Sequence, residues 1–261
     1  MARVRLLSTD FDGTLIGFGS DGRCTPALAS VLAEHKRSGG LWAINTGRNL
    51  WHAQNGVASL EAPVEPDFLL TNEREIFHRT PDGRYVPEHH WNETCYRHHD
   101  ELFRRAEPVF QKIRALASRH EGIDLIEEDN RPAGIITSSE GIMQEFVDFL
   151  EALDHDLEDF SYQRNTIYLR FSHAFYHKGS ALGELSRITG IDPREIMAAG
   201  DHFNDIPMLD GRYAVHAACP SNSIPEVVAT VRAAGGYHAG RVAADGVAEA
   251  WHHFSSTSRD V

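Results

Sequence analysis

The chain has 261 residues, of which 41% are hydrophobic and 24% are charged, a composition typical of a folded protein without the long apolar run of a membrane span. Its formal net charge of -13 at pH 7 argues against non-specific binding to nucleic acid or to an anionic membrane surface. The three cysteines are far apart, which excludes a disulfide framework and a zinc motif, and the N-terminus has no signal-peptide pattern, so we expect a cytoplasmic protein.

The first part of the chain alternates between short apolar runs and helical patterns. We predict strands at residues 4–9, 41–45 and 67–70 and helices at residues 26–38 and 50–60. The first helix has a start signal, because Thr25 can cap it and Pro26 suits its first turn. Strands that are apolar throughout and alternate with helices indicate a parallel sheet buried between helices, as in an α/β fold.

From residue 75 onward the pattern changes to paired strands. We predict a hairpin with strands at residues 76–78 and 85–86, a polar helix at 96–119 broken at Pro108, strands at 123–127 and 134–137, a helix at 142–153, and a second hairpin with strands at 160–163 and 166–171. Hairpins with helices between them indicate an antiparallel sheet. We therefore expect an inserted α+β domain over residues 75–177.

The α/β pattern returns after the insert. We predict helices at residues 180–189, 204–209, 225–233 and 246–254 and strands at 196–199 and 214–217. Residues 1–74 and 178–261 are then expected to form one Rossmann-like core with a parallel sheet, interrupted by the insert.

Two pairs of acidic residues follow predicted buried strands of the core. Asp10 and Asp12 follow the first strand, and Asp201 and Asp205 follow the strand at 196–199. Side chains at the carboxyl ends of parallel strands face the crevice where α/β proteins bind ligands, so we expect all four to meet. Two like charges at about 4 Å repel by roughly 4 kcal/mol, and a hard divalent cation such as Mg²⁺ relieves this repulsion. Ordinary solvated carboxylates in turns are the alternative interpretation.

Two further segments carry groups that can bind an anion. Thr46, Gly47 and Arg48 follow the second predicted strand and begin a helix, whose free backbone N–H groups attract anions. Lys178 lies where the insert returns to the core, although a lone lysine is more often a solvated surface charge. Neither segment is specific by itself.

Taken together and in this order, residues 10–15, 44–48, 177–179 and 200–205 resemble the four motifs of the haloacid dehalogenase superfamily of phosphohydrolases. The insert is similar to the large cap of the Cof-type branch, which includes sugar-phosphate phosphatases. This resemblance implies a Mg²⁺-dependent phosphomonoesterase that hydrolyses a small phosphorylated metabolite, with the cap setting the specificity. The chain departs from the branch at residues 72–74, which read Asn-Glu-Arg where members often carry Asn-Gly-Ala.

The resemblance also implies roles for the motif residues. Asp10 would attack phosphorus to give an aspartyl-phosphate, and Asp12 would protonate the leaving alcohol and then activate water. The phosphoryl oxygens would be held by Thr46, the Gly47 amide and Lys178.

The same resemblance supplies a metal site and candidate substrate contacts. The implied ligands of Mg²⁺ are the Asp10 carboxylate, the Asp12 backbone carbonyl, Asp201 and, through a water molecule, Asp205. Asn204 would orient Lys178 or the phosphate. The polar residues that we regard as candidates for substrate binding are Arg48, Glu73, Arg131, Arg164 and Tyr168.

Two other functions remain open from the sequence. A phosphomutase or phosphotransferase would use the same aspartyl-phosphate, although residues 46–48 are more similar to the hydrolase branch. A non-catalytic binding or regulatory protein is less favoured, because no position of the four motifs is missing. The 16 histidines form no zinc motif, and we expect them on the solvated surface.

Overall fold

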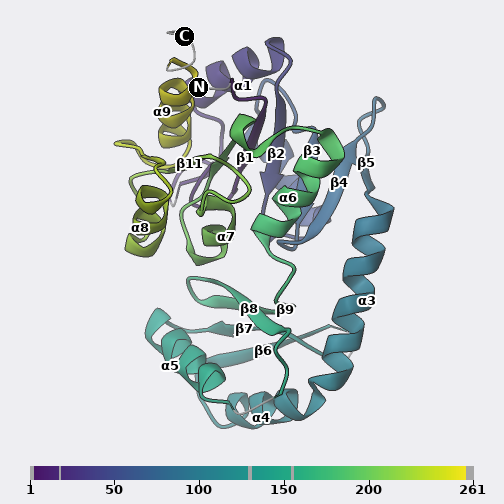
Figure 1. Ribbon diagram of the computed structural model, residues 1–261. Coiled ribbons are helices and arrows are strands. Elements are labelled where there is room, and N and C mark those ends of the chain that lie inside the picture. Colours follow the sequence, from purple (N-terminus) through teal and green to yellow (C-terminus); the bar gives the residue numbers. More distant parts are fainter. Residues whose placement is uncertain (1–2, 18, 129–130, 154–155, 257–261) are drawn as a thin grey trace. The chain divides into compact units, whose positions relative to one another are not determined.

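The computed structural model describes residues 3–17, 19–128, 131–153 and 156–256, and the chain divides into two compact units (Figure 1). The larger unit combines Met1–Asn92 with Lys178–Val261, and the smaller unit is Glu93–His177. Among the helices within the described ranges, none is long and apolar enough to span a membrane.

The larger unit is built on one sheet with the strand order β12-β11-β10-β1-β2-β3-β4-β5. Its strands are β1 (Leu6–Thr9), β2 (Leu41–Asn45), β3 (Phe68–Thr71), β4 (Glu75–Arg79), β5 (Tyr85–Pro87), β10 (Ile196–Ala199), β11 (His216–Cys219) and β12 (Tyr237–His238). All neighbouring strands from β12 to β3 pair in parallel. The predicted α/β core with a mainly parallel sheet is therefore confirmed, and β1 and β10 are neighbouring strands in its middle.

Helices cover both faces of this sheet. They are α1 (Pro26–Arg37), α2 (Leu50–Leu60), α6 (Lys178–Thr189), α7 (Ile206–Leu209), α8 (Pro225–Ala233) and α9 (Ala243–Ser256), with short 3-10 helices η1 (Pro193–Glu195) and η2 (Phe203–Asp205). Residues of α1, α2 and α9 share one apolar cluster, and residues of α6, α7 and α8 share another. Because side chains alternate along a strand, Leu6 joins the second cluster and Leu7 the first. Helix α1 begins as predicted, since the Thr25 side chain accepts a hydrogen bond from the Leu28 N–H.

The first hairpin, which we expected within the insert, belongs instead to the core sheet. β4 pairs with β3 in antiparallel fashion, with Thr71 opposite Glu75, and β5 pairs with β4 in the same way. A tight turn brings the chain back beside the strand it has just left, and antiparallel pairing needs no longer connection. The units consequently divide between Asn92 and Glu93, inside α3 (His89–Arg105), and not at residue 75.

The smaller unit contains the antiparallel sheet that the sequence predicts, with the order β6-β7-β9-β8. Its elements beyond α3 are α4 (Glu107–Ala117), β6 (Ile123–Glu128), β7 (Arg131–Thr137), α5 (Glu140–Glu151), β8 (Phe160–Asn165) and β9 (Tyr168–His173). Phe110 of α4, Phe146 of α5 and Phe171 of β9 belong to its apolar core. The helix expected at 96–119 with a break at Pro108 is two helices, α3 and α4. Pro108 lies in the first turn of α4, where a missing N–H is tolerated.

Candidate active site

The acidic residues that follow β1 and β10 come together because these two strands are neighbours. Thr9 is paired in register with Ala199, and the Asp10 N–H donates to the Ala199 carbonyl at 2.9 Å. Asp201 follows the end of β10 after a single glycine, Gly200. Both segments therefore leave the sheet at its carboxyl edge, where parallel α/β sheets bind ligands.

Asp10, Asp201 and Asp205 form a buried group of carboxylates. One oxygen of each side chain lies within 4.8 Å of the others. Burial, together with the charge of Asp205, raises the pKa of Asp10 well above its ordinary value. The same two effects, burial first, raise the pKa of Asp201 to about 7. Three negative charges this close together in a buried place are unfavourable, so the group requires a cation beside it.

Lys178, the first residue of α6, is a fully buried cation within this group. Its Nζ donates to Asp10 Oδ1 and to Asp205 Oδ1, at 2.6 Å in each case. Burial alone would lower the pKa of this lysine, but the charges of Asp10, Asp205 and Glu73 outweigh that effect and raise it. The Asn45 side chain at the end of β2 donates to the Lys178 carbonyl at 2.9 Å. Lys178 is therefore a structural part of the site and not a solvated surface charge.

Hydrogen bonds and close packing hold Asp201 and Asp205 in place. Thr14 Oγ1 donates to Asp201 Oδ1 at 2.7 Å. A Cβ on Gly13 would lie 2.2 Å from Asp201 Oδ2, and Gly13 also has a φ of +85°, so both the packing and the turn require glycine here. Asp205 Oδ2 accepts the N–H groups of Asp201 and His202 at 2.8 and 2.9 Å. Both oxygens of Asp205 are thus engaged, one by backbone amides and one by the lysine.

Asp12 lies outside this group of three carboxylates, although its charge still contributes, after burial and Asp205, to the raised pKa of Asp201. Both oxygens of Asp12 accept hydrogen bonds from Arg48, Oδ2 from Nε at 2.8 Å and Oδ1 from Nη2 at 2.6 Å. The Arg48 guanidinium also lies over the Phe11 ring, 4.4 Å from its centroid. A Cβ on Gly56 of α2 would meet both Arg48 and Phe11 within 3 Å, so the glycine makes room for this stack. The opposite charge of Arg48 thus holds the Asp12 carboxylate through two charge-assisted hydrogen bonds.

Glu73 and Asn204 form a second buried contact beside Lys178. Asn204 Nδ2 donates to Glu73 Oε1 at 2.7 Å, whereas we expected Asn204 to orient Lys178 or a phosphate. The Glu73 N–H donates to the Thr46 carbonyl at 3.0 Å. A Cβ on Gly47 would lie 3.3 Å from Glu73 Oε1. The turn after β3 therefore packs directly on the Thr46-Gly47 segment.

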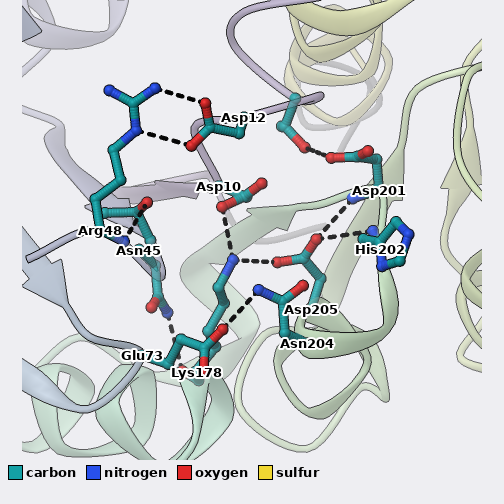
Figure 2. A network of polar contacts seen from close by, with 12 residues as sticks. Asp10, Asp12, Asn45, Arg48, Glu73, Lys178, Asp201, His202, Asn204 and Asp205 are labelled. Atoms are coloured by element: carbon teal, nitrogen blue, oxygen red, sulfur yellow. Dashed lines mark hydrogen bonds and ion pairs between the residues drawn. The ribbon is translucent and has the colours of Figure 1, made fainter. Parts of the chain in front are cut away.

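Figure 2 shows that these side chains come from five segments of the larger unit and that Lys178 points between Asp10 and Asp205. Thr14 and Asn45 belong to the site, although no role was predicted for either residue. Thr14 could have been found from its place within the first motif, and Asn45 from its place directly before Thr46.

Three of the substrate-binding candidates, Arg131, Arg164 and Tyr168, lie in the smaller unit. Arg131 of β7 donates to Asp100 Oδ1 at 2.9 Å, and Arg164 of β8 donates to Gln144 Oε1 at 2.7 Å. Both arginines therefore make polar contacts within their own unit.

Among the histidines that the structure describes, three are buried, so for these the expectation of a surface position is wrong. His35, His99 and His216 are buried. His35 Nε2 lies 2.9 Å from the Leu41 carbonyl, and His99 Nδ1 lies 2.8 Å from the Cys95 carbonyl. A buried neutral imidazole is satisfied by such backbone partners, which a sequence pattern does not reveal.

Comparison with known proteins finds a matching family model and a related protein of known name. A model of the haloacid dehalogenase-like hydrolases matches residues 67–250. The glucosylglycerol-phosphate synthase of Pseudomonas anguilliseptica is 27% identical over 261 residues, which cover 95% of this chain and 30% of that protein. The chain thus spans less than a third of this relative.

Solved structures show the same fold. The sucrose-phosphatase of Synechocystis sp. PCC6803, in complex with sucrose and phosphate, has a TM-score of 0.70 at 22% identity, covering 97% of this chain and 98% of that chain. BT1666 of Bacteroides thetaiotaomicron, described among the phosphatases of the haloalkanoate enzyme superfamily, has a TM-score of 0.61 at 20% identity, covering 97% and 95%.

Proposed function

The chain belongs to the haloacid dehalogenase-like hydrolases, and from this premise we propose that it is a Mg²⁺-dependent phosphomonoesterase that forms an aspartyl-phosphate on Asp10. One observation carries the proposal: Asp10 is buried at the carboxyl edge of the sheet, with Lys178 Nζ 2.6 Å away and with Asp201 and Asp205 in the same group. Membership of the family shows a hydrolase, while the action on phosphate esters, the intermediate, the metal and the substrate are our proposals.

The three carboxylates of Asp10, Asp201 and Asp205 suit a hard divalent cation. The donors are oxygens only and they are buried, and this burial together with their mutual repulsion raises the pKa values of Asp10 and Asp201. Asp10, Asp201 and the Asp12 backbone carbonyl would hold Mg²⁺ directly. Asp205 would act through water, since its oxygens are already engaged. When bound, Mg²⁺ supplies positive charge to the phosphoryl oxygens.

Two aspartates carry the chemistry in this proposal. An Asp10 oxygen attacks phosphorus, and the ester P–O bond breaks as Asp12 gives a proton to the leaving alcohol. A water molecule then attacks the phosphorus of the aspartyl-phosphate, its proton passes to Asp12, and the Asp10 carboxylate is released with inorganic phosphate. Arg48 orients Asp12 through its two hydrogen bonds.

The phosphoryl group would be bound by Thr46, the Gly47 N–H and Lys178. Thr46 is buried at the end of β2, and its Oγ1 accepts the Arg48 N–H at 3.2 Å, which fixes the loop. Lys178 provides the positive charge that a phosphoryl group requires in a strongly acidic protein. Phosphoryl transfer depends mainly on such positioning and charge.

We propose a small sugar phosphate or a related metabolite as the substrate. Two proteins that the chain resembles carry names that refer to sugar phosphates, sucrose-phosphatase and glucosylglycerol-phosphate synthase. The polar residues Arg131 and Arg164 of the smaller unit are the candidates for contacts with the sugar part.

A panel of phosphorylated metabolites tests this function. Purified protein with Mg²⁺ should release inorganic phosphate from at least one sugar phosphate, and EDTA should abolish the release. Asp10→Asn should be inactive, while Asp210→Asn, at a partly exposed position after α7, should retain activity. Isomerised sugar phosphate without free phosphate would instead indicate a phosphotransferase, and full activity after chelation would refute the metal site.

A further inference from the structure

Glu73 is held in an unusual backbone conformation at the site. Asn72 and Glu73 have φ values of 48° and 65°, in the left-handed region that residues with a Cβ normally avoid. Hydrogen bonds fix this turn, because the Asn72 N–H donates to the Arg48 carbonyl and the Glu73 N–H to the Thr46 carbonyl. The turn thus delivers the Glu73 side chain to a defined place, although its backbone favours glycine.

The Glu73 carboxylate lies among the groups to which we assign phosphoryl binding. It is 4% exposed, and its Oε1 accepts the Asn204 amide at 2.7 Å. The Cα of Gly47 faces the same oxygen so closely that a Cβ there would approach it to 3.3 Å. Its charge also acts on Lys178, where it favours the protonated lysine. Figure 2 shows Glu73 and Asn204 meeting beside the Lys178 side chain.

From this arrangement we propose that Glu73 weakens the binding of phosphate at the active site, by setting a further carboxylate beside the groups that hold the phosphoryl oxygens. The inference rests on the proposed phosphatase function. Asp10, Asp201 and Asp205 form the group of carboxylates that would hold the metal. The Glu73 carboxylate instead contacts Asn204 and lies against Gly47, whose N–H we assign to phosphoryl binding. The free phosphate product and the phosphoryl group of a substrate both carry negative charge. Glu73 therefore opposes retention of the product and equally raises the KM of the substrate.

The direct test compares the affinity of inorganic phosphate for the full-length wild-type protein, Glu73→Gln and Glu75→Gln, each with saturating Mg²⁺, by titration calorimetry. Glutamine keeps the size of Glu73 and can still accept the Asn204 amide, so only the charge is removed. Glu75 is a matched control, because it is a buried carboxylate of the same turn whose partners are Thr71 Oγ1 and Asn72 Nδ2. If Glu73→Gln fails to fold, Glu73→Gly replaces it, since glycine adopts the left-handed conformation without strain.

We expect the Kd of inorganic phosphate to fall on the order of tenfold in Glu73→Gln, as for the loss of one like charge at several ångströms in partly buried surroundings. The product-inhibition constant and the KM should fall with it, and Glu75→Gln should match the wild type. An unchanged or weaker affinity for phosphate in Glu73→Gln would overturn the inference. Because equilibrium binding needs no turnover, that outcome differs from a failure of the proposed function, in which the wild-type protein releases no phosphate from any ester.

Discussion

At the scale of single residues, the site gives different surroundings to two aspartates that have only one residue between them in the sequence. Asp10 is buried against Lys178, whereas Asp12 is half-exposed and bound by Arg48. This difference matches two separate tasks, because a nucleophile needs a fixed position and a proton carrier needs access to the leaving group and to water. Phe11, between them in the sequence, is buried in the core beneath the Arg48 guanidinium that binds Asp12.

Replacing Asp12 by asparagine should reveal the proton-carrying role. The variant keeps the backbone carbonyl and the size of the side chain but cannot carry a proton, so we expect kcat for alkyl phosphates to fall by about 10²–10⁴-fold. The fall should be much smaller for aryl phosphates, whose leaving groups need no proton. Steady-state kinetics on both classes checks this, with Asp21→Asn in an exposed turn as the neutral control. Equal losses for the two classes would argue against Asp12 as the acid.

Replacing Lys178 by methionine should destabilise the protein strongly when no metal is present. The buried Asp10 and Asp205 would both lose their cation, and breaking a buried ion pair typically costs about 3–5 kcal/mol. Mg²⁺ should recover part of the loss by binding the carboxylates. Urea unfolding with and without Mg²⁺ measures both effects. Arg187→Ala, which breaks the pair between the exposed Arg187 and Glu184, should leave the free energy of unfolding almost unchanged and serves as the control. A loss for Lys178→Met no larger than that of the control would refute the assigned role.

At the scale of elements, His35 joins α1 to the sheet and to α9. Its Nε2 lies 2.9 Å from the Leu41 carbonyl, and its Nδ1 lies 3.4 Å from Trp251 Nε1. A Cβ on Gly40 would lie 2.3 Å from the imidazole ring, so the turn between α1 and β2 is closed directly over it. With one ring nitrogen donating and the other accepting, this place suits the neutral form of the ring.

Protonation of His35 should therefore cost stability in acid. Burial lowers the pKa of His35 below 6.5, its ordinary value in the unfolded chain. Below that pH the unfolded state binds more protons than the folded state, so the free energy of unfolding decreases as the pH falls through the lowered pKa. For one proton the slope is at most about 1.4 kcal/mol per pH unit.

The measurement is urea unfolding between pH 7.5 and pH 5 for the wild type and for His35→Gln, which cannot titrate. The difference between the two isolates His35 from Asp10 and Asp201, whose raised pKa values act in the opposite direction. Their folded forms hold protons more tightly, so their contribution to stability decreases as the pH rises. Parallel pH profiles for the two proteins would contradict the prediction.

At the scale of the whole molecule, the order of strands and helices could be predicted from the sequence more fully than the contacts within the site. Apolar runs identify β1, β2 and β10 because parallel strands are buried on both faces, and the carboxyl ends of these strands locate Asp10 and Asp201. The pairing of Asp12 with Arg48 and of Asn204 with Glu73 joins residues that are far apart in the sequence. No local pattern encodes such contacts, since they depend on which strands become neighbours.

The boundary of the smaller unit illustrates the same limit. The local sequence of β4 and β5 indicates a hairpin, but it does not indicate which sheet this hairpin extends. Once β4 pairs with β3, the edge of the core sheet moves and the smaller unit begins at Glu93. The division into units is therefore a property of the assembled sheet and not of its separate segments.

The division into two units predicts that phosphate chemistry and substrate choice can be separated by mutation. Every residue that we assign to the phosphoryl group or the metal lies in the larger unit, whereas Arg131 and Arg164 lie in the smaller one. Replacing either arginine by alanine should change the relative kcat/KM among sugar phosphates by up to about 1–3 kcal/mol, the scale of a hydrogen bond to a charged group. Hydrolysis of a small aryl phosphate should hardly change.

A panel of sugar phosphates measured beside an aryl phosphate checks this, with Arg104→Ala on the exposed side of α3 as the control in the same unit. Lys178→Met, by contrast, should impair hydrolysis of all substrates alike, because every phosphate ester presents the same group to the larger unit. The two kinds of variant therefore make opposite predictions for the ratio of sugar-phosphate to aryl-phosphate hydrolysis. If neither arginine variant changes that ratio beyond the Arg104→Ala control, these two residues do not set the specificity.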